Sequence, residues 1–286
     1  MENKQIFVVA GPTASGKSDF AVELALKCNG EIISADSRQL YKGLDVGTGK
    51  ITHNEMRGVK HYMLDVCDVN QEFSVADYKA LAFPILQDIL IRGKTPIICG
   101  GTGQYIDALI FTTTLPEVAP NKELRGNLEL KSTEQLYKTL IQKDRARAES
   151  IDKHNRVRVI RALEIIDTLG KVPTQGQPEF CFPTKLYLMN PSRELLRKRI
   201  TMRLEKRLQI GMIEEVQNLI EEGYEDEKTL KRFGIEYFVI GEYLKHKLSL
   251  PEMKSILINK SMQYAKRQQT WNKKYLPFAE LVEVEK

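Results

Sequence analysis

The first half of the chain alternates short apolar runs with segments in which apolar residues recur every three or four positions. The runs occupy residues 6–10, 31–35, 61–66 and 95–101, and the helix-like segments occupy residues 17–28 and 74–92. Short apolar runs are typical of strands buried on both faces, and their alternation with helices favours a parallel sheet covered by helices. Pro84 predicts a kink or a break in the second helix, because proline cannot donate the helical hydrogen bond.

The pattern changes after Thr112. Residues 115–181 contain few strand-like runs, several basic residues and helical periodicity, which predicts a helical insertion. The apolar run at 185–190 predicts a strand that returns to the sheet. We therefore expect a discontinuous core, formed by residues 1–114 and 182–286, that is interrupted by the insertion.

Long helices are predicted after the returning strand. The first carries an apolar stripe that recurs every four positions, at Leu196, Ile200, Leu204 and Leu208. A row of arginines lies one step round the same helix, at Arg199, Arg203 and Arg207, which directs them toward the rim of the sheet. The last helix is predicted to begin at a capping box near Ser249 and to end at about Tyr275.

Composition narrows the class of protein. The 286 residues carry a net charge of +5, and no apolar run reaches the roughly 18–20 residues that span a bilayer. The first residues lack the pattern of a secretory signal, and the four cysteines form no CxxC pair that would indicate zinc or a disulfide framework. We expect a cytoplasmic, monomeric protein with reduced thiols and no membrane partner.

The stretch GPTASGKS, residues 11–18, fits the phosphate-loop pattern G-x-x-x-x-G-K-[ST] at every fixed position. It lies between a predicted strand and a predicted helix, as the motif requires. Backbone N–H groups and the helix N-terminus would surround a phosphate, Lys17 would contact it, and Ser18 could ligate Mg²⁺. The predicted fold is therefore an α/β, P-loop NTPase-like parallel sheet with helices on both faces, a helical insertion and C-terminal helices.

The carboxylate that accompanies this loop in nucleotide hydrolases is missing from its usual place. Such enzymes end an apolar strand in an Asp that holds Mg²⁺, whereas the run at 95–101 ends in glycine and is followed by Thr102. Asp36 does follow a predicted strand, at the sheet edge where ligands bind in this fold class. It could hold Mg²⁺ or accept a proton, and the pattern leaves both roles open. Thr102 could contact a phosphate.

Basic residues gather in three segments, 143–161, 193–207 and 265–274. Such segments are typical of solvated helix faces. The last one also contains Trp271, and Tyr264 and Tyr275 flank it. Aromatic rings among basic residues favour the binding of single-stranded nucleic acid, so both interpretations stay open.

Six stretches together resemble the tRNA dimethylallyltransferases, also called tRNA isopentenyltransferases. They are GPTASGKS (11–18), SADSRQLYKGLDVGTGK (34–50), IICGGTGQYIDALI (97–110), RVRVIRALEII (156–166), RITMRLEKRLQIGMIEEV (199–216) and YAKRQQTW (264–271). They occur in the family's order and span nearly the whole chain. Many enzymes share the phosphate loop, whereas the second and last stretches are specific. The chain departs from the family at Met262, where an arginine is common, and in a shortened insertion.

The resemblance implies transfer of a dimethylallyl group from dimethylallyl diphosphate to the exocyclic amine of an adenosine in tRNA. That adenosine lies 3′ to the anticodon in tRNAs that read codons beginning with U, so the anticodon stem-loop is the expected partner. Diphosphate would leave, with Mg²⁺ as cofactor. The alternatives are a P-loop kinase or ATPase that acts on a nucleoside triphosphate, and a tRNA-binding protein with a relict loop.

The resemblance also implies residue roles. Diphosphate binding is implied for Gly11, Pro12, Thr13, Ala14, Ser15, Gly16, Lys17 and Ser18, with Ser18 as metal ligand. Asp36 matches the general base. Catalytic contacts to the leaving diphosphate are implied for Lys17, Thr102 and Arg203. Contacts to tRNA are implied for Asp36, Ser37, Arg38, Gln39, Thr102, Arg125, Arg158, Arg161, Lys266, Arg267, Gln268 and Gln269, and the insertion 115–181 would bind tRNA.

Overall fold

The computed structural model describes residues 5–112, 116, 118–119, 121–173 and 179–284. The chain divides into two compact units, one formed by Met1–Phe111 with Phe180–Lys286 and the other by Thr112–Glu179. Across the described residues, no helix is both long enough and apolar enough to cross a membrane. The predicted cytoplasmic location and monomeric state stay predictions.

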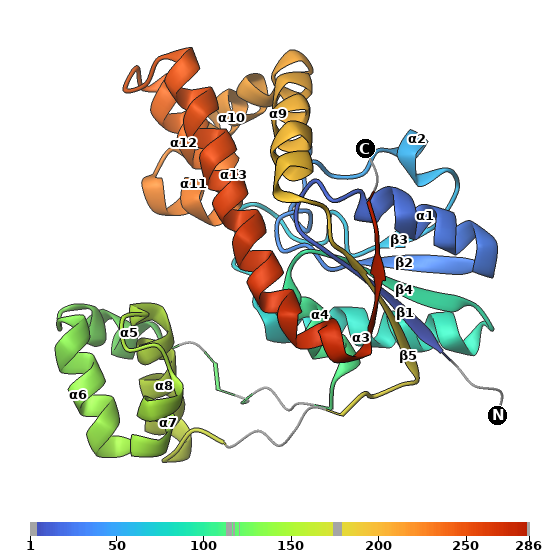
Figure 1. Cartoon of the computed structure of the whole chain (residues 1–286). Helices are drawn as coiled ribbons and strands as arrows, with labels where there is room; N and C mark the ends of the chain where they lie inside the picture. Colours follow the sequence, from blue (N-terminus) through green and yellow to red (C-terminus); the bar gives the residue numbers. More distant parts are fainter. Residues whose placement is uncertain (1–4, 113–115, 117, 120, 174–178, 285–286) are drawn as a thin grey trace. The chain divides into compact units, whose positions relative to one another are not determined.

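A six-stranded parallel sheet forms the centre of the larger unit (Figure 1). Its strands are β1 (Ile6–Ala10), β2 (Gly30–Ser34), β3 (His61–Tyr62), β4 (Thr95–Gly100), β5 (Thr184–Met189) and β6 (Ala279–Val282), in the order β3-β2-β4-β1-β5-β6. Every neighbouring pair is parallel. The carboxyl ends of the strands therefore share one edge, where the phosphate loop follows β1.

Helices cover both faces of this sheet, because alternate strand residues point to opposite sides. On β1, Val8 belongs to a core that includes helices α3 (Val75–Ile91) and α4 (Gly103–Ile110), whereas Val9 packs with helix α1 (Lys17–Cys28). Figure 1 shows α1 on one face and the other two helices on the opposite face. The predicted α/β class with two covered faces is confirmed.

Two local predictions differ from the structure. The predicted strand 61–66 is reduced to two residues, because Met63 and Asp65 adopt φ angles of 62° and 55° and leave the extended conformation. Helix α3 is continuous through Pro84, so the predicted break does not occur. Burial of neighbouring side chains such as Leu86 offsets the hydrogen bond that proline cannot make.

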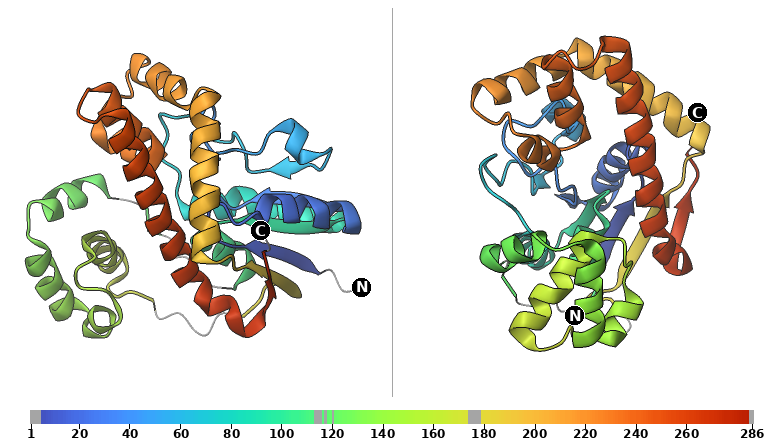
Figure 2. Two further views of the ribbon diagram at one scale, coloured as in Figure 1. Left: turned by 45° about the horizontal axis from the view of Figure 1, so that its top comes forward. Right: turned by 90° about the vertical axis from the view of Figure 1, so that its left-hand side faces the viewer.

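The remaining elements of the larger unit follow β2 and β5. They are α2 (His53–Met56), α9 (Arg193–Gln209), α10 (Met212–Glu221), α11 (Glu227–Phe233), α12 (Ile235–Leu244), α13 (Leu250–Asn272) and the 3-10 helix η1 (Lys273–Phe278). A capping box of Ser249 and Glu252 starts α13. Helices α9 and α13 pack against each other, as both views in Figure 2 show. Strand β6 was not predicted, since its four residues AELV are too few to show an apolar run or an alternating pattern.

The smaller unit is helical over its described residues. It consists of α5 (Lys122–Glu129), α6 (Thr133–Lys143), α7 (Arg145–Ser150) and α8 (Arg156–Leu169), which enclose their own apolar core. Leu136, Leu140 and Val159 are fully buried in that core. A separate core explains why this segment forms a compact unit of its own.

A buried carboxylate on β2 makes stability depend on pH. Arg92 donates to both Glu31 oxygens, at 2.9 and 2.6 Å, and Lys94 and the Tyr62 hydroxyl donate at 2.7 and 2.8 Å. The Arg92 hydrogen bonds, followed by those from Lys94 and Tyr62, outweigh burial and lower the pKa of Glu31 to about 2. A lowered folded-state pKa stabilises the protein above the unfolded-state pKa of 4.5, and this contribution disappears as the pH falls toward 2.

Replacing Glu31 with glutamine removes the charge that Arg92 and Lys94 bind and is expected to lower the free energy of unfolding at pH 7. The expected loss is only about 1–2 kcal/mol, because water partly screens these two cations. Urea unfolding of both proteins at pH 7 and at pH 3 measures the effect. The difference between them should shrink at pH 3. A difference that is equal at the two pH values would contradict the assigned role of the carboxylate.

Candidate active site

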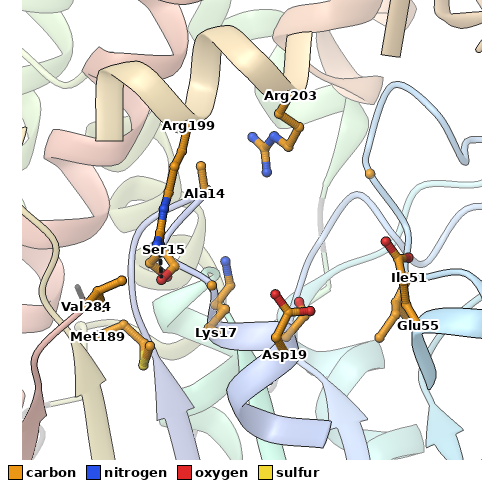
Figure 3. A pocket seen from close by; sticks show the side chains of 13 residues that line it. Ala14, Ser15, Lys17, Asp19, Ile51, Glu55, Met189, Arg199, Arg203 and Val284 are labelled. Atoms are coloured by element: carbon orange, nitrogen blue, oxygen red, sulfur yellow. Dashed lines mark hydrogen bonds between the residues drawn. The ribbon is translucent and has the colours of Figure 1, made fainter. Parts of the chain in front are cut away.

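The phosphate loop connects β1 to α1 and has a backbone conformation suited to anion binding. Ala14 and Gly16 have φ angles of 61° and 85°, so the chain turns tightly around a small concave surface. Gly11 admits no side chain, because a Cβ atom there would lie 2.8 Å from the Cβ atom of Met189. Figure 3 shows the Lys17 side chain directed into the pocket beside this loop.

The arginine row of α9 faces the rim of the sheet, as predicted. The apolar stripe of this helix is buried at Leu196 and Leu204, which turns the arginines toward the loops at the sheet edge. Arg199 donates to the Ser15 carbonyl at 3.3 Å, and Arg203 donates to the Thr13 hydroxyl at 2.6 Å. In Figure 3 both side chains extend from α9 toward the phosphate loop. Arg207, one turn further, donates to the Gly47 carbonyl at 3.2 Å.

Three cations lie partly or fully buried at this edge of the sheet: Lys17 and Arg203 are half-buried, and Arg207 is buried. Burial lowers the pKa of Lys17, which the nearby Asp36 carboxylate only partly offsets. Burial, and then the charge of Arg207, lower the pKa of Arg203, and burial likewise lowers the pKa of Arg207. Each lowered pKa means that the protein stabilises the positive charge less than water does. A multiply charged anion in this space would supply the missing stabilisation.

Two adjoining pockets occupy this edge of the sheet. The first has a volume of about 600 Å³ and lies over the phosphate loop, with Arg199, Arg203 and Glu55 in its wall. The second, of about 230 Å³, is lined by Asp36, Gln39, Tyr237, Tyr264, Arg267 and Gln268, among others. Both pockets are lined by Lys17, Ser18, Gly49 and Arg203. The phosphate loop and Asp36 thus lie on two sides of one cationic boundary.

Asp36 follows β2 in a turn that the backbone holds firmly. Its Oδ1 atom accepts the Arg38 N–H at 2.9 Å. The Ser37 N–H donates to the Thr102 hydroxyl at 3.0 Å, and the Thr102 N–H donates to the Ala35 carbonyl at 3.0 Å. The glycine-rich turn after β4 therefore braces the segment that carries the carboxylate.

The end of β4 cannot carry the carboxylate of a nucleotide hydrolase. At Gly100 a Cβ atom would lie 2.1 Å from the Ala35 carbonyl oxygen, a separation that real side chains do not reach. The glycine is required by the close approach of β2 and β4. The missing strand-end aspartate thus has a steric cause. Asp36, which follows β2, lines the second pocket instead.

The loop before α2 contributes Gly49 to both pockets, and Glu215 on α10 anchors it. The Glu215 carboxylate accepts the N–H groups of Asp45, Val46 and Gly47 at 2.9, 2.7 and 2.9 Å, and the Tyr237 hydroxyl at 2.7 Å. Sequence reasoning missed this anchor. A carboxylate that lies about 170 residues from the amides it binds leaves no local pattern to detect.

Several residues expected to contact tRNA are engaged within the protein. Gln39 donates to the Gly49 carbonyl at 3.0 Å, and Gln268 is buried with both ends of its amide bonded to backbone groups. Lys266 and Arg267 are exposed on α13, and the Arg267 guanidinium lies 5.6 Å from the centre of the Tyr264 ring. A cation beside an aromatic ring suits contact with a nucleotide base. The contacts of Lys266 and Arg267 with tRNA stay predictions, and so do those of Ser37, Arg38 and Gln269.

The smaller unit holds the other predicted tRNA contacts. Arg125 binds the buried Glu164 carboxylate through two hydrogen bonds, at 2.7 and 2.8 Å, and Arg161 binds it at 3.3 Å. Burial alone would raise the pKa of Glu164, but the hydrogen bonds, led by that from Arg125, outweigh it and lower the pKa. Arg158 is exposed on α8. Arg125 therefore joins α5 to α8, whereas Arg161 binds Glu164 within α8 and donates to the Val118 carbonyl at 2.8 Å.

The fold and the site define an α/β enzyme with a phosphate loop, in which a cationic boundary separates the loop from a carboxylate. The family model for IPP transferase matches residues 39–275. The tRNA dimethylallyltransferase of Thermoanaerobacter sp. strain X514 is 42% identical, over 95% of this chain and 89% of the relative; that of Anoxybacillus flavithermus is 40% identical, over 96% and 89%. The chain therefore belongs to the tRNA dimethylallyltransferase family.

Solved structures agree with this assignment. The full-length tRNA isopentenylpyrophosphate transferase of Bacillus halodurans has a TM-score of 0.74 and 34% identity, and the match covers 99% of this chain and 90% of that one. A eukaryotic dimethylallyltransferase acting on tRNA has a TM-score of 0.87 and 26% identity, with coverage of 99% and 74%. The similarity extends over the fold as well as the sequence.

Proposed function

We propose that this chain transfers a dimethylallyl group from dimethylallyl diphosphate to the exocyclic amine of the adenosine 3′ to the anticodon. The substrates would be tRNAs that read codons beginning with U. Family membership supports the reaction, and one observation supports the placement of the substrates: the two pockets adjoin at Lys17 and Arg203. The diphosphate would occupy the phosphate-loop side and the adenosine the Asp36 side.

The chemistry follows from this placement. An adenine amine is a weak nucleophile, because its lone pair is delocalised into the ring. As the amine nitrogen bonds to the allylic carbon, the bond from that carbon to the diphosphate oxygen breaks. Asp36 accepts the amine proton, while Lys17, Arg203 and the loop N–H groups stabilise the charge on the departing diphosphate. Burial lowers the pKa of Lys17 and Arg203 because their charges lose contact with water. A bound diphosphate would restore the lost stabilisation, so these cations would bind the departing anion strongly.

The residues fit a role for Mg²⁺ that depends on the substrate. Ser18 lines both pockets and offers one hydroxyl ligand. Within the described part of the chain, no group of three or more His, Cys, Asp or Glu side chains could hold a metal ion by itself. Mg²⁺ commonly takes few protein ligands and completes its shell with phosphate oxygens and water. When bound, the ion would add positive charge against the diphosphate.

The target base must leave the anticodon stack to reach Asp36, because that carboxylate lines a pocket of only about 230 Å³. Tyr264 and Arg267, in the same wall, offer an aromatic ring and a guanidinium beside an extruded base. Unpaired bases are recognised by such stacking contacts. The second pocket would thus receive one nucleotide rather than a duplex.

Donor choice separates this proposal from a P-loop kinase or ATPase. Purified protein with Mg²⁺ and [³H]dimethylallyl diphosphate is expected to label unmodified tRNA, whereas ATP in place of the donor should release no phosphate with or without tRNA. A tRNA transcript with guanosine at the target position serves as the control and should stay unlabelled. Phosphate release from ATP without prenyl transfer would favour the alternative.

A further inference from the structure

Gln268 on α13 bridges two loops of the site that are distant in sequence. Its Oε1 atom accepts the Thr13 N–H at 2.7 Å, and its Nε2 atom donates to the Gly101 carbonyl at 3.0 Å. The side chain is 6% exposed, so these bonds are largely shielded from water. One neutral amide thus joins the phosphate loop to the glycine-rich turn after β4.

Each loop held by Gln268 carries one half of the site. On one side, the Thr13 hydroxyl accepts from Arg203 at 2.6 Å, so the position of Thr13 affects the boundary between the pockets. On the other side, Gly101 precedes Thr102, whose hydroxyl accepts the Ser37 N–H at 3.0 Å, next to the predicted general base Asp36. The separation of the phosphate loop from the turn that carries Asp36 therefore depends on the Gln268 amide.

Surrounding residues restrict the amide to this arrangement. A Cβ atom at Gly101 would lie 2.1 Å from Nε2 of Gln268, so a glycine there is needed to admit the amide. The Thr13 N–H donates to Oε1 and is therefore already paired before any phosphate enters the loop. Both polar ends of the side chain have backbone partners, whereas a ligand-binding side chain would have an unpaired polar atom directed into the pocket.

We propose that Gln268 is a positioning residue that fixes the phosphate loop relative to the Asp36 turn, rather than a residue that binds tRNA. The expected effect of Gln268 on catalysis rests on the proposed function. A positioning role explains why Gln268 is buried although Lys266 and Arg267, which precede it in sequence, are exposed. Only a side chain that both donates and accepts at this length can join the two loops.

The test compares Gln268→Met with Gln268→Asn. Methionine has a similar length but forms neither hydrogen bond, and asparagine is one methylene too short to join both partners. Isothermal titration with inorganic diphosphate and Mg²⁺, in the absence of tRNA, should show a Kd about 10-fold higher for Gln268→Met and a smaller rise for Gln268→Asn. The single-turnover rate at saturating substrates should fall about 10²-fold, since misplacement of reacting groups slows the chemical step.

Two further variants separate positioning from tRNA binding. Lys266→Met should weaken tRNA binding and reduce its salt dependence, but leave diphosphate binding unchanged. For Gln268→Met the tRNA Kd and its salt dependence should stay within about twofold of the parent, because neither bond involves a charge. Thr270→Ala, at an exposed position of the same helix, is the matched control and should change none of these quantities.

The inference is overturned if Gln268→Met weakens tRNA binding while its diphosphate Kd and single-turnover rate match the parent. Thermal unfolding checks that each variant is folded, and if the methionine variant is not, the asparagine variant decides by the same criteria. Diphosphate binding without tRNA does not require prenyl transfer. A parent protein that binds diphosphate but transfers nothing would therefore contradict the proposed function and leave the binding test of Gln268 intact.

Discussion

Replacing Asp36 with asparagine is expected to lower the rate of dimethylallyl transfer by about 10²–10⁴-fold, the usual range for loss of a general base. Asparagine has the same shape and can still accept the Arg38 N–H that now binds Oδ1 at 2.9 Å. The turn should therefore survive, and the loss should lie in the chemical step. Single-turnover transfer at saturating tRNA and donor measures it.

The control for Asp36 is Asp88→Asn, which makes the same substitution at an exposed carboxylate on α3. Its transfer rate should equal that of the parent. The Kd of Asp36→Asn for tRNA should change by less than about threefold, since the neutral amide keeps the shape of the pocket wall. An Asp36→Asn protein with more than about a third of the parental single-turnover rate would show that another group accepts the proton.

Replacing Arg203 is expected to have the second largest effect. Arg203→Ala removes a half-buried cation from the boundary of both pockets and should lower kcat/KM for the donor by about 10²–10³-fold. Arg203→Lys should recover little, because one ammonium cannot bind the Thr13 hydroxyl and a diphosphate with the geometry of a planar guanidinium. Steady-state kinetics with varied donor concentration measure both variants.

Arg197→Ala provides the comparison for Arg203, since Arg197 is exposed on the same helix. It should keep kcat/KM for the donor within about twofold. The KM for tRNA should be nearly constant in Arg203→Ala, because the guanidinium is half-buried and bonded to Thr13 of the phosphate loop. A variant that loses tRNA affinity but keeps donor affinity would place Arg203 on the RNA side instead.

Local sequence signals predicted much of the fold and part of the site. The phosphate loop is continuous in sequence, and its strand and helix neighbours have clear periodicities, so residues 6–28 could be assigned directly. The four-residue spacing of Leu196, Ile200 and Leu204 likewise predicted the face that presents Arg203. These features depend on contacts within one element, which periodicity records.

The features that were missed depend on distant partners. Gln268 lies 255 residues from Thr13, and Glu215 lies 168 residues from Gly47, so neither bond has a local pattern. Helix α3 passes through Pro84 because packing against the sheet outweighs a local preference. Tertiary contacts also form β6, which pairs only with β5 at the sheet edge.

The most direct measurement of the central claim is the position of the modified nucleoside after reaction. An unmodified tRNA that reads a UNN codon is incubated with the protein, Mg²⁺ and dimethylallyl diphosphate, then digested and analysed by mass spectrometry. We expect one dimethylallyl group on the exocyclic nitrogen of the adenosine 3′ to the anticodon and one diphosphate released for each group transferred. Asp36→Asn should give neither product on the same timescale. Unmodified tRNA from the parent protein, or a group at another nucleoside, would contradict the proposed function.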